Sequence, residues 1–340
     1  KILPTTDMGK RRIAVLGAGE WGTTLARIVA TTAAQDAAFE SIINLWVPEE
    51  DVGGEALSSV INSSRENPLY LPGVTLPEGV RALPDLREAV TGASVLVFAL
   101  PLHLIEHLAP SIRGACASSP SVLCLADGSS LAGGPEAHAE TAVKRALADN
   151  ATDVSSLLPP EGSLEDLNAG VLCEVLLGSA DKLQASLWAR LLAAPGVRVR
   201  CTAIVAHVEV AAALIPVVAL AAGWCDGLGL GGNTKAAVIR TGLEEIRVAC
   251  AFLHPDRESC TQPVSCPALE DSPLAQLLAA CYGGPDRACA HFFAAEGGAV
   301  RWEEAECEVA GGDRSAGVVN ARHLAGRLDS ARAKARLPLL

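Results

Sequence analysis

The first clear pattern along the chain is a short apolar run, a group of glycines and an amphipathic stretch. Ile13–Leu16 is wholly apolar and predicts a buried strand. A GxGxxG sequence follows, and then Leu25, Ile28 and Val29 recur at the spacing of one helix face. Strand, glycine turn and helix in this order are typical of the opening of a dinucleotide-binding βαβ unit. The pattern therefore predicts an α/β domain near the start of the chain.

The glycine turn is the candidate cofactor site. Its first glycine permits a tight turn, its second lets the backbone approach a pyrophosphate, and its third lets the helix pack closely on the strand. The free N–H groups and the positive end of the helix then face the phosphates. A purely structural glycine turn is the alternative. The residues expected to bind NAD are Gly17, Ala18, Gly19, Glu20, Trp21 and Gly22.

Later apolar runs continue the pattern of a doubly wound parallel sheet, whose central strands are apolar throughout. Further strands are expected at Ile42–Val47, Ala93–Leu100, Ser121–Leu125, Val171–Gly178 and Val197–Cys201. Helices are expected at Leu86–Thr91, Leu102–Ile112, Gly133–Asn150 and Lys182–Leu192. Residues 52–79 are expected to be irregular, and residues 151–169, which are polar and contain proline, are expected to be a loop or an edge of the sheet. From residue 203 onward the period is helical. We predict a Rossmann-like domain over residues 10–201 and an all-helical domain over residues 202–340.

Composition narrows the function classes. The net charge is −12 and the chain has no basic tract, which argues against nucleic acid and anionic membranes as partners. The longest apolar run, Val210–Gly223, is too short to span a bilayer and predicts a buried helix.

Eleven cysteines without CxxC pairs favour a reducing compartment, either cytoplasm or mitochondrion. His103 and His107 are spaced i, i+4 but have no third ligand, so no metal site is expected. The first residue is Lys1, which indicates a processed or trimmed start.

Acidic residues follow the expected second strand, in the sequence Pro48-Glu49-Glu50-Asp51. Carboxylates at this place suit the ribose hydroxyls of NAD and would repel the extra phosphate of NADP. A solvated acidic turn fits the same residues equally well.

Five stretches together resemble a known family. They are Gly17–Gly22, Leu45–Gly54, Tyr70–Pro72, Trp224–Arg240 and Cys281–Gly284. In these stretches the chain resembles the NAD-dependent glycerol-3-phosphate dehydrogenase family of the eukaryotic type. The resemblance implies a Rossmann-like domain followed by an all-helical domain. It also implies reversible hydride transfer between NADH and dihydroxyacetone phosphate, and a dimeric assembly.

The positions that the resemblance assigns to chemistry hold other residues here. In the family they carry two lysines, an aspartate and a threonine that support a lysine, and an Arg-Asn pair that grips the phosphate. The matching residues in this chain are Asp127, Ile215 with Pro216 beside it, Gln276, Ala280, Pro285 and Asp286.

These replacements remove the groups that ketone reduction needs. Ile215 cannot donate a proton, and general acid catalysis typically contributes about 100- to 10,000-fold. Asp127 in place of a lysine reverses an interaction of about 4 kcal/mol with a substrate phosphate. Pro216 predicts a kink in its helix. We therefore predict no catalytic residues and a pseudoenzyme retained as a structural or scaffold subunit. Its expected setting is a homodimer or a larger assembly, for example a mitochondrial one.

The alternative is an NAD-dependent oxidoreductase that reduces a ketone. Its substrate would be either an uncharged ketone, with Asp127 or Glu161 in the reaction, or dihydroxyacetone phosphate itself if the replaced positions are misaligned. For the dinucleotide, Pro48 and Leu104 stand where the family has aromatic residues, which weakens binding without abolishing it. A retained or vestigial NAD site is expected.

Polar residues that remain in the matching stretches offer little replacement chemistry. Lys235 and Arg240 are interpreted as a solvated helix face or a subunit contact. Arg287 is a candidate anion contact that its neighbour Asp286 opposes. The full set is Asp226, Asn233, Lys235, Arg240, Tyr282 and Arg287.

Overall fold

The structure is a computed structural model that describes residues 10–126, 139–147, 154–160, 164–254, 273–297, 299–312, 314–327, 337 and 339–340. The chain divides into two compact units. The first unit comprises Lys1–Cys124, Val143–Val154 and Ser186–Pro195, and the second unit comprises Leu125–Ala142, Ser155–Ala185 and Gly196–Leu340. The predicted division into residues 10–201 and 202–340 stays a prediction.

The first unit is built on parallel strands in the order β7-β6-β1-β2-β5. Their bounds are Ile13–Leu16 for β1, Ile43–Trp46 for β2, Val80–Leu83 for β5, Val95–Phe98 for β6 and Ser121–Leu125 for β7. Every residue of β1 and β6 is buried, as expected for the centre of a parallel sheet covered on both faces. The apolar runs of the sequence therefore predicted the middle of this sheet.

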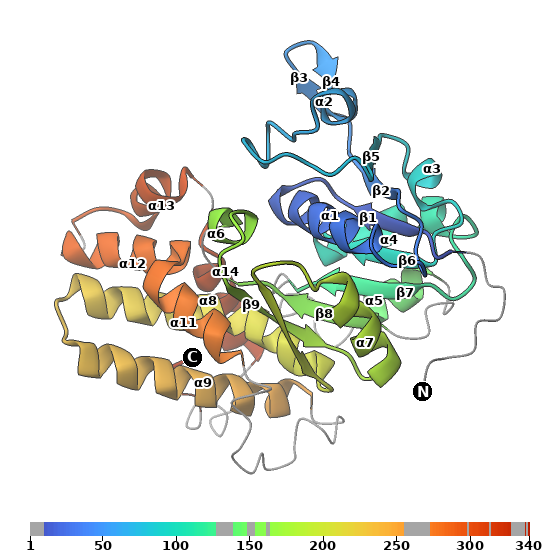
Figure 1. Ribbon diagram of the computed structural model, residues 1–340. Helices are drawn as coiled ribbons and strands as arrows, with labels where there is room; N and C mark the ends of the chain where they lie inside the picture. The colour runs from blue at the N-terminus through green and yellow to red at the C-terminus, as the bar shows by residue number, and fades with distance from the viewer. Residues whose placement is uncertain are drawn as a thin grey trace. The chain divides into compact units, whose positions relative to one another are not determined.

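Helices cover these strands. Helix α1 packs against β1, β2 and β5, and Figure 1 shows it lying across them. The helices up to residue 191 are α1 (Glu20–Ala33), α2 (Leu57–Ser64), α3 (Leu86–Val90), α4 (Leu102–Ile112), α5 (Ala139–Ala146), α6 (Leu164–Asn168) and α7 (Lys182–Leu191).

Two segments, one predicted to be irregular and one predicted to be a loop or an edge, are more regular than expected. Residues 52–79 contain helix α2 and most of a two-stranded hairpin formed by β3 (Asp51–Val52) and β4 (Glu55–Ala56). Residues 151–169 contain helix α6 and strand β8 (Val154–Leu158). The reason for the second error is visible in β8, where Ser155 and Ser156 are fully buried and hydrogen-bonded. Buried serines obscure the apolar period on which the prediction depended.

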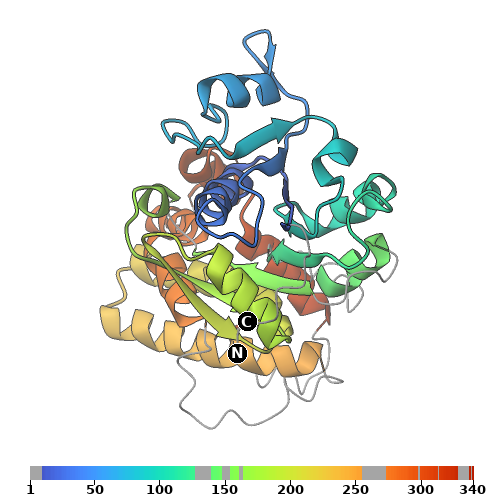
Figure 2. The same ribbon diagram turned by 45° about the vertical axis from the view of Figure 1, so that its right-hand side comes forward.

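The second unit contains three strands and a set of long helices. Strand β9 (Cys173–Gly178) pairs antiparallel with β8 and parallel with β10 (Val197–Thr202). In the views of Figures 1 and 2, helix α9 runs alongside α8. The helices are α8 (Val205–Gly227), α9 (Gly232–Leu253), α11 (Leu274–Gly283), α12 (Pro285–Ala295), α13 (Trp302–Ala310) and α14 (Ala316–Arg327). The described residues after Thr202 form helices and no strand, so the doubly wound sheet followed by an all-helical part is confirmed.

Helix α8 is the centre of the second unit. Among the described residues it is the one helix long and apolar enough to cross a membrane, but 89% of its apolar window is buried inside the protein. The predicted buried helix is thus confirmed, although it is longer than the apolar run that predicted it. Helix α8 continues through Pro216 without interruption. The Asn320 side chain of α14 donates from Nδ2 to the Ala213 carbonyl at 2.9 Å and so joins α14 to α8.

Candidate dinucleotide site and the positions of the substrate site

The glycine turn joins β1 to α1 in the conformation that its sequence predicts. Gly17 has φ +105°, a backbone conformation that favours glycine, and a Cβ atom there would lie 2.5 Å from the Ala99 carbonyl oxygen. The N–H of Gly17 donates to the Trp46 carbonyl of β2 at 3.3 Å. The turn is therefore held against both neighbouring strands of β1.

The two other glycines of the turn differ in their surroundings. A Cβ on Gly22 would lie 1.9 Å from the Gly17 carbonyl oxygen, so close packing of α1 requires this glycine. A Cβ on Gly19 would meet no atom within 4 Å. The protein's own packing therefore does not require Gly19, and its missing side chain leaves open space beside the backbone. That space fits a pyrophosphate held by backbone N–H groups.

Helix α1 begins directly behind this space. Its N-cap, Gly19, provides no side-chain hydrogen bond to the first turn, so the dipole of a 14-residue helix is open to an anion. Glu20 lies exposed in that first turn, whereas Ala18 is buried and Trp21 is half-buried. The six predicted residues thus lie together in this turn and the start of α1, and the exposed carboxylate among them is that of Glu20.

A buried asparagine supports the turn, and the sequence did not single it out. Asn67 is 0% exposed and donates from Nδ2 to the Ala18 carbonyl at 2.8 Å and to Thr23 Oγ1 at 2.9 Å. Thr23 Oγ1 in turn donates to the same Ala18 carbonyl at 2.9 Å. The one signal in the sequence is an asparagine followed by proline, which is typical of a turn.

The acidic residues after β2 contact groups of the protein itself. Glu50 accepts from the Tyr70 hydroxyl, at 2.9 Å to Oε1 and 2.8 Å to Oε2. This hydrogen bond, together with burial and the negative charge of Glu50, raises the pKa of Tyr70. Asp51 Oδ1 accepts from the Gly54 N–H at 3.1 Å. A role of these carboxylates at the ribose of NAD stays a prediction.

In the second unit, two of the expected substrate-site positions lie in the apolar core. Ile215 and Ala280 are each 0% exposed and belong to one hydrophobic cluster with Leu176 and Leu277. Gln276 is also buried and donates from Nε2 to the Glu174 carbonyl at 2.8 Å, while its Oε1 has no hydrogen-bond partner among the described residues. Apolar atoms therefore fill the positions where the family resemblance implies a lysine and a threonine.

The Pro285–Asp286 pair has a structural explanation. Pro285 occupies the first turn of α12, where its missing N–H costs little. Asp286 Oδ1 accepts from the Ser315 hydroxyl and, at 2.9 Å, from the Gly317 N–H at the start of α14. Burial raises the pKa of Asp286, although these two hydrogen bonds act in the opposite direction. Asp286 therefore joins α12 to the N-terminus of α14.

The cationic residues of the second unit form an ion-pair cluster. Asp226 Oδ2 accepts from Lys235 Nζ at 2.7 Å and from Arg287 Nε at 2.7 Å. Although burial alone would raise the pKa of Asp226, the hydrogen bonds from Lys235 and Arg287 lower it. Lys235 Nζ also lies 4.6 Å from the centre of the Tyr282 ring, a cation–π contact.

One interpretation of these cations changes as a result. The interpretation of Lys235 as solvated was wrong, because its side chain is only 11% exposed in its ion pair. Arg287 pairs with Asp226 through Nε and Nη2, and a contact of its other N–H groups with an anion stays a prediction. Arg240 does lie on a solvated face, since its side chain is 74% exposed and pairs with Glu244 at i, i+4.

Three other candidate residues are not covered by the described part of the structure. Asp127 and Glu161 lie outside the described residues, as does the side chain of His103. No cluster of three metal-ligating side chains occurs in the part of the chain that the structure describes.

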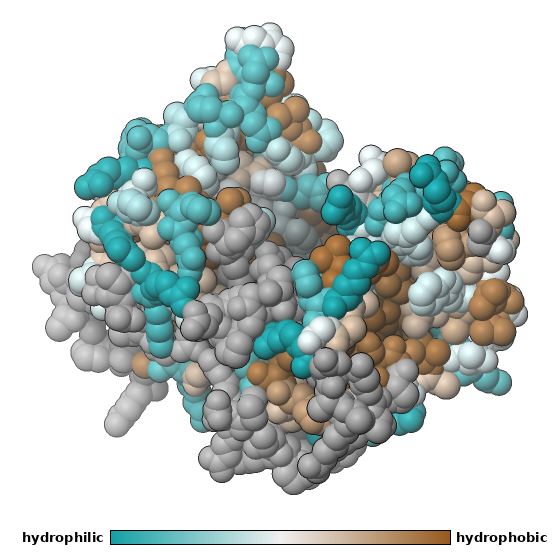
Figure 3. All heavy atoms as spheres, turned by 180° about the vertical axis from the view of Figure 1, so that it is seen from behind, coloured by the Kyte–Doolittle hydropathy of each residue, from teal (hydrophilic) through white to brown (hydrophobic). Residues whose placement is uncertain are grey.

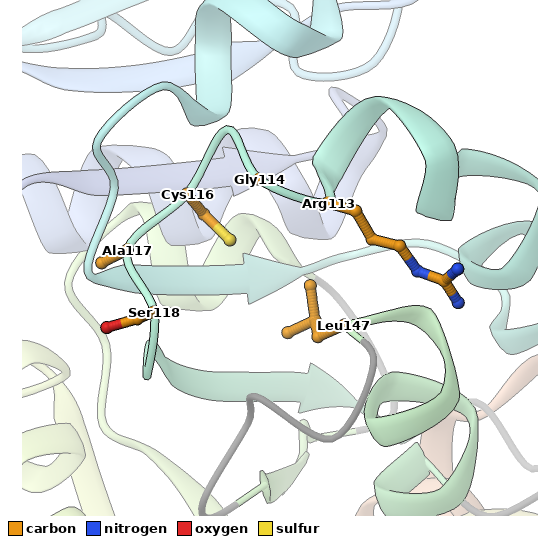
Figure 4. Close-up of a pocket in the computed structure, with 6 residues that line it drawn as sticks. All are labelled: Arg113, Gly114, Cys116, Ala117, Ser118 and Leu147. Atoms are coloured by element: carbon orange, nitrogen blue, oxygen red, sulfur yellow. The ribbon is translucent and has the colours of Figure 1, made fainter.

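A small cavity of about 220 Å³ lies beside the turn after α4 (Figure 4). Its lining includes Arg113, but this guanidinium donates to the Arg145 and Ala146 carbonyls at the end of α5. Figure 4 shows the Arg113 side chain reaching away from Cys116 and Ser118. The Arg113 guanidinium is therefore directed to the end of α5.

The glycine turn on a parallel sheet defines the class of protein as a Rossmann-type dinucleotide-binding protein. Residues 12–185 match the family NAD-dependent glycerol-3-phosphate dehydrogenase N-terminus, and residues 205–339 match the corresponding C-terminus. The chain belongs to the NAD-dependent glycerol-3-phosphate dehydrogenase family.

Individual relatives agree with this assignment. The cytoplasmic NAD⁺ glycerol-3-phosphate dehydrogenase of Oryctolagus cuniculus is 36% identical over 319 residues, which cover 93% of this chain and 88% of the relative. The human cytoplasmic enzyme is 35% identical over 318 residues, with the same coverage of 93% and 88%. The solved structure of glycerol-3-phosphate dehydrogenase from Saccharomyces cerevisiae is similar with a TM-score of 0.83 and 25% identity, covering 97% of this chain and 93% of that one. The family resemblance drawn from the sequence is therefore confirmed.

Proposed function

We propose that this member of the family binds NAD(H) at its glycine turn but does not reduce dihydroxyacetone phosphate. It acts instead as a non-catalytic structural subunit. The observation that carries the proposal is the burial of Ile215, which is 0% exposed within the apolar cluster of the second unit. The family resemblance implies a lysine at this position.

The chemistry of ketone reduction explains why this observation matters. Hydride addition to a carbonyl develops negative charge on oxygen, which requires an acid or a cation close by. Ile215 and Ala280 supply neither, and Asp286 brings a carboxylate to a position where the resemblance implies a phosphate contact. The nearby cations Lys235 and Arg287 are engaged by Asp226. At the described positions where the resemblance implies a lysine, a threonine and an Arg-Asn pair, this chain therefore has no ammonium or guanidinium group.

NAD binding is supported by the turn in the first unit. Its pyrophosphate contacts would come from backbone N–H groups, which the replacements in the second unit do not touch. The open space at Gly19 and the uncapped start of α1 fit the cofactor. When bound, NADH supplies a hydride donor. The protein's own contribution is to hold the pyrophosphate beside Gly19.

The second candidate function is that of a working NAD-dependent ketone reductase. The extent of similarity to named dehydrogenases favours it, with 36% identity over 93% of the chain. Its substrate would be dihydroxyacetone phosphate or an uncharged ketone. The proton would come from Asp127 or Glu161, both outside the described residues.

A structural subunit needs a surface that contacts its partners, and it must share a compartment with them. Apolar surface shows on the right-hand side of the molecule seen from behind (Figure 3). Large apolar side chains of the second unit that are more than one-third exposed include Trp224, Leu228, Leu230, Leu278 and Tyr282. We infer a second copy or a larger assembly as the partner. The cytoplasmic names of the relatives support an intracellular location, and a mitochondrial assembly is part of the same proposal.

Two measurements on the purified protein test the proposal. Titration calorimetry measures NADH binding, and the loss of NADH absorbance with dihydroxyacetone phosphate measures turnover, with the rabbit enzyme as the positive control. We expect saturable NADH binding and a turnover rate equal to the blank without enzyme. Turnover well above that blank would establish the ketone reductase instead.

A further inference from the structure

We propose that Asn67 is the positioning residue of the dinucleotide site, and this inference rests on the proposed binding of NADH. Asn67 lies in the segment after α2, and it is assigned no contact with the ligand. Its side-chain amide fixes the direction of one peptide group in the glycine turn. That peptide group joins Ala18 to Gly19.

Three buried hydrogen bonds converge on the Ala18 carbonyl and its neighbour Thr23. Asn67 Nδ2 donates to the carbonyl oxygen at 2.8 Å and to Thr23 Oγ1 at 2.9 Å. Thr23 Oγ1 donates to the same carbonyl at 2.9 Å. Asn67 and Thr23 are each 0% exposed. Water therefore cannot easily replace the lost donor if Asn67 is changed.

The planarity of the peptide group transmits this contact to the ligand side. The Ala18 carbonyl and the Gly19 N–H belong to one trans peptide, in which the two groups point in opposite directions. Since Asn67 and Thr23 hold the carbonyl on the buried side, the Gly19 N–H is turned to the other side. The open space beside Gly19 suits an anion that this N–H would bind. Asn67 thus orients a phosphate-binding donor that it does not touch.

The orientation of the Asn67 amide is itself fixed. Its Oδ1 accepts from the Tyr70 N–H at 3.2 Å, and its main-chain carbonyl accepts from the Leu71 N–H at 2.9 Å. Because Asn67 Oδ1 faces the Tyr70 N–H, Asn67 Nδ2 must face the Ala18 carbonyl. The flipped amide would place oxygen against the carbonyl and nitrogen against the N–H, so only one of the two amide orientations makes both hydrogen bonds. The Tyr70 hydroxyl bonds to Glu50, which ties this segment to the chain after β2.

A second asparagine provides a matched control. Asn62 of α2 also uses both ends of its amide, donating to the Ala82 carbonyl at 2.8 Å and accepting from the Ala82 N–H at 2.9 Å. These bonds join α2 to β5, and none of them reaches the glycine turn. Removing the Asn62 hydrogen bond to Ala82 therefore measures how much stability a buried amide of this region contributes without any contact to the glycine turn.

The experiment compares Asn67→Asp with Asn62→Asp in the full chain. Aspartate has the shape of asparagine but cannot donate at Nδ2, so Asn67→Asp places an oxygen against the Ala18 carbonyl. Hydrogen exchange measures the amides of residues 17–23 without ligand, and calorimetry measures the Kd for NADH. For Asn67→Asp we expect exchange about tenfold faster and NADH binding about tenfold weaker. For Asn62→Asp we expect a lower unfolding temperature with less than about a twofold change in either quantity.

Thr23→Val is the second variant, in case Asn67→Asp does not fold. It removes one hydroxyl donor to the Ala18 carbonyl and keeps Asn67, and we expect exchange about threefold faster. Unchanged exchange at residues 17–23 in both variants would overturn the proposal, as would an equal effect of Asn62→Asp. If the wild-type protein binds no NADH, the proposed function fails, while the exchange comparison still decides the role of Asn67.

Discussion

The glycine turn of the first unit and the core around Ile215 in the second unit differ in their match to the family. The turn has the glycines that the family resemblance implies, and the core has apolar residues where the resemblance implies polar ones. At the turn, Gly19 faces open space and Gly17 and Gly22 fit closely against backbone. Around Ile215, apolar side chains fill the positions where the family resemblance implies polar chemistry. Gly19 has open space beside it, whereas Ile215 lies in the interior of the second unit.

The difference reflects which atoms perform each task. Pyrophosphate binding at a helix N-terminus depends on backbone N–H groups and on the absence of side chains. Proton donation depends on one side chain at one place, so one substitution removes it. A protein can therefore lose the second function while its backbone preserves the first. The four predictions below test this contrast, from the largest expected effect to the smallest.

Ile215→Lys tests whether the position implied for a lysine is closed. An ammonium group placed in this cluster would lie among buried apolar side chains, and we expect a loss of about 3–5 kcal/mol in the free energy of unfolding. Urea unfolding measures it. Ile215→Met, which keeps the volume, should cost less than about 1.5 kcal/mol. If lysine and methionine cost the same, then the position is open to solvent and the closed core is wrong.

The pair Gly22→Ala and Gly19→Ala separates packing from ligand binding. A methyl group on Gly22 would lie 1.9 Å from a backbone oxygen, so we expect a loss of about 1–3 kcal/mol in stability. Gly19 has extended backbone and open space, so alanine there should leave the unfolding temperature unchanged. Gly19→Ala should still weaken NADH binding by about tenfold, because its methyl group fills the space for the pyrophosphate. Unchanged affinity in this variant would mean that the turn is purely structural.

The sequence predicted best the strands and helices that an apolar run or a helical period marks within the segment itself. Strands β1 and β7 and helix α4 have the predicted bounds, because an apolar run or a helical period marks each end. Strand β8 was missed because its buried serines bond to Ser179 and Glu209, which are distant in sequence. Tertiary hydrogen bonds of this kind make a polar residue suitable for a core, and no local period shows them.

In the candidate site, too, features set by local sequence were predicted and features set by contacts between distant residues were not. The strand, glycine turn and helix were predicted, since the motif is contiguous, and NAD contact by its six residues stays a prediction. Asn67 was missed because its partners Thr23 and Ala18 lie 44 and 49 residues away. Lys235 was misread as solvated because its partner Asp226 lies on a different helix. Contacts between elements decide such residues, and a single sequence does not contain them.

Asp286→Asn tests the structural explanation of the Pro285–Asp286 pair through pH. Because burial raises the pKa of Asp286 in the folded protein, its contribution to stability is fully present below the ordinary value of 3.8 and is lost as pH rises through the folded value. The difference in unfolding free energy between wild type and Asp286→Asn should therefore shift in favour of the wild type as pH falls from about 7 to about 4. Urea unfolding at several pH values measures it. A difference independent of pH would show that the carboxyl is solvated.

Glu20→Gln is expected to give the smallest effect. Glu20 places an exposed negative charge at the start of α1, where the phosphates would lie. Charges near a helix terminus are worth about 0.3–1 kcal/mol, so the variant should bind NADH about threefold more tightly at low salt. The gain should shrink at high salt because the charge is exposed. Calorimetry at two salt concentrations measures both, and weaker binding by the variant would mean that Glu20 itself contacts the cofactor.

The central claim is that this family member keeps its cofactor site without the chemistry of reduction. The most direct test is one sample of the wild-type protein, assayed for NADH binding by calorimetry and for NADH consumption with dihydroxyacetone phosphate. The account predicts saturable binding and no consumption above the blank. Consumption that rises in proportion to protein concentration would contradict it and would assign the chain to the working dehydrogenases.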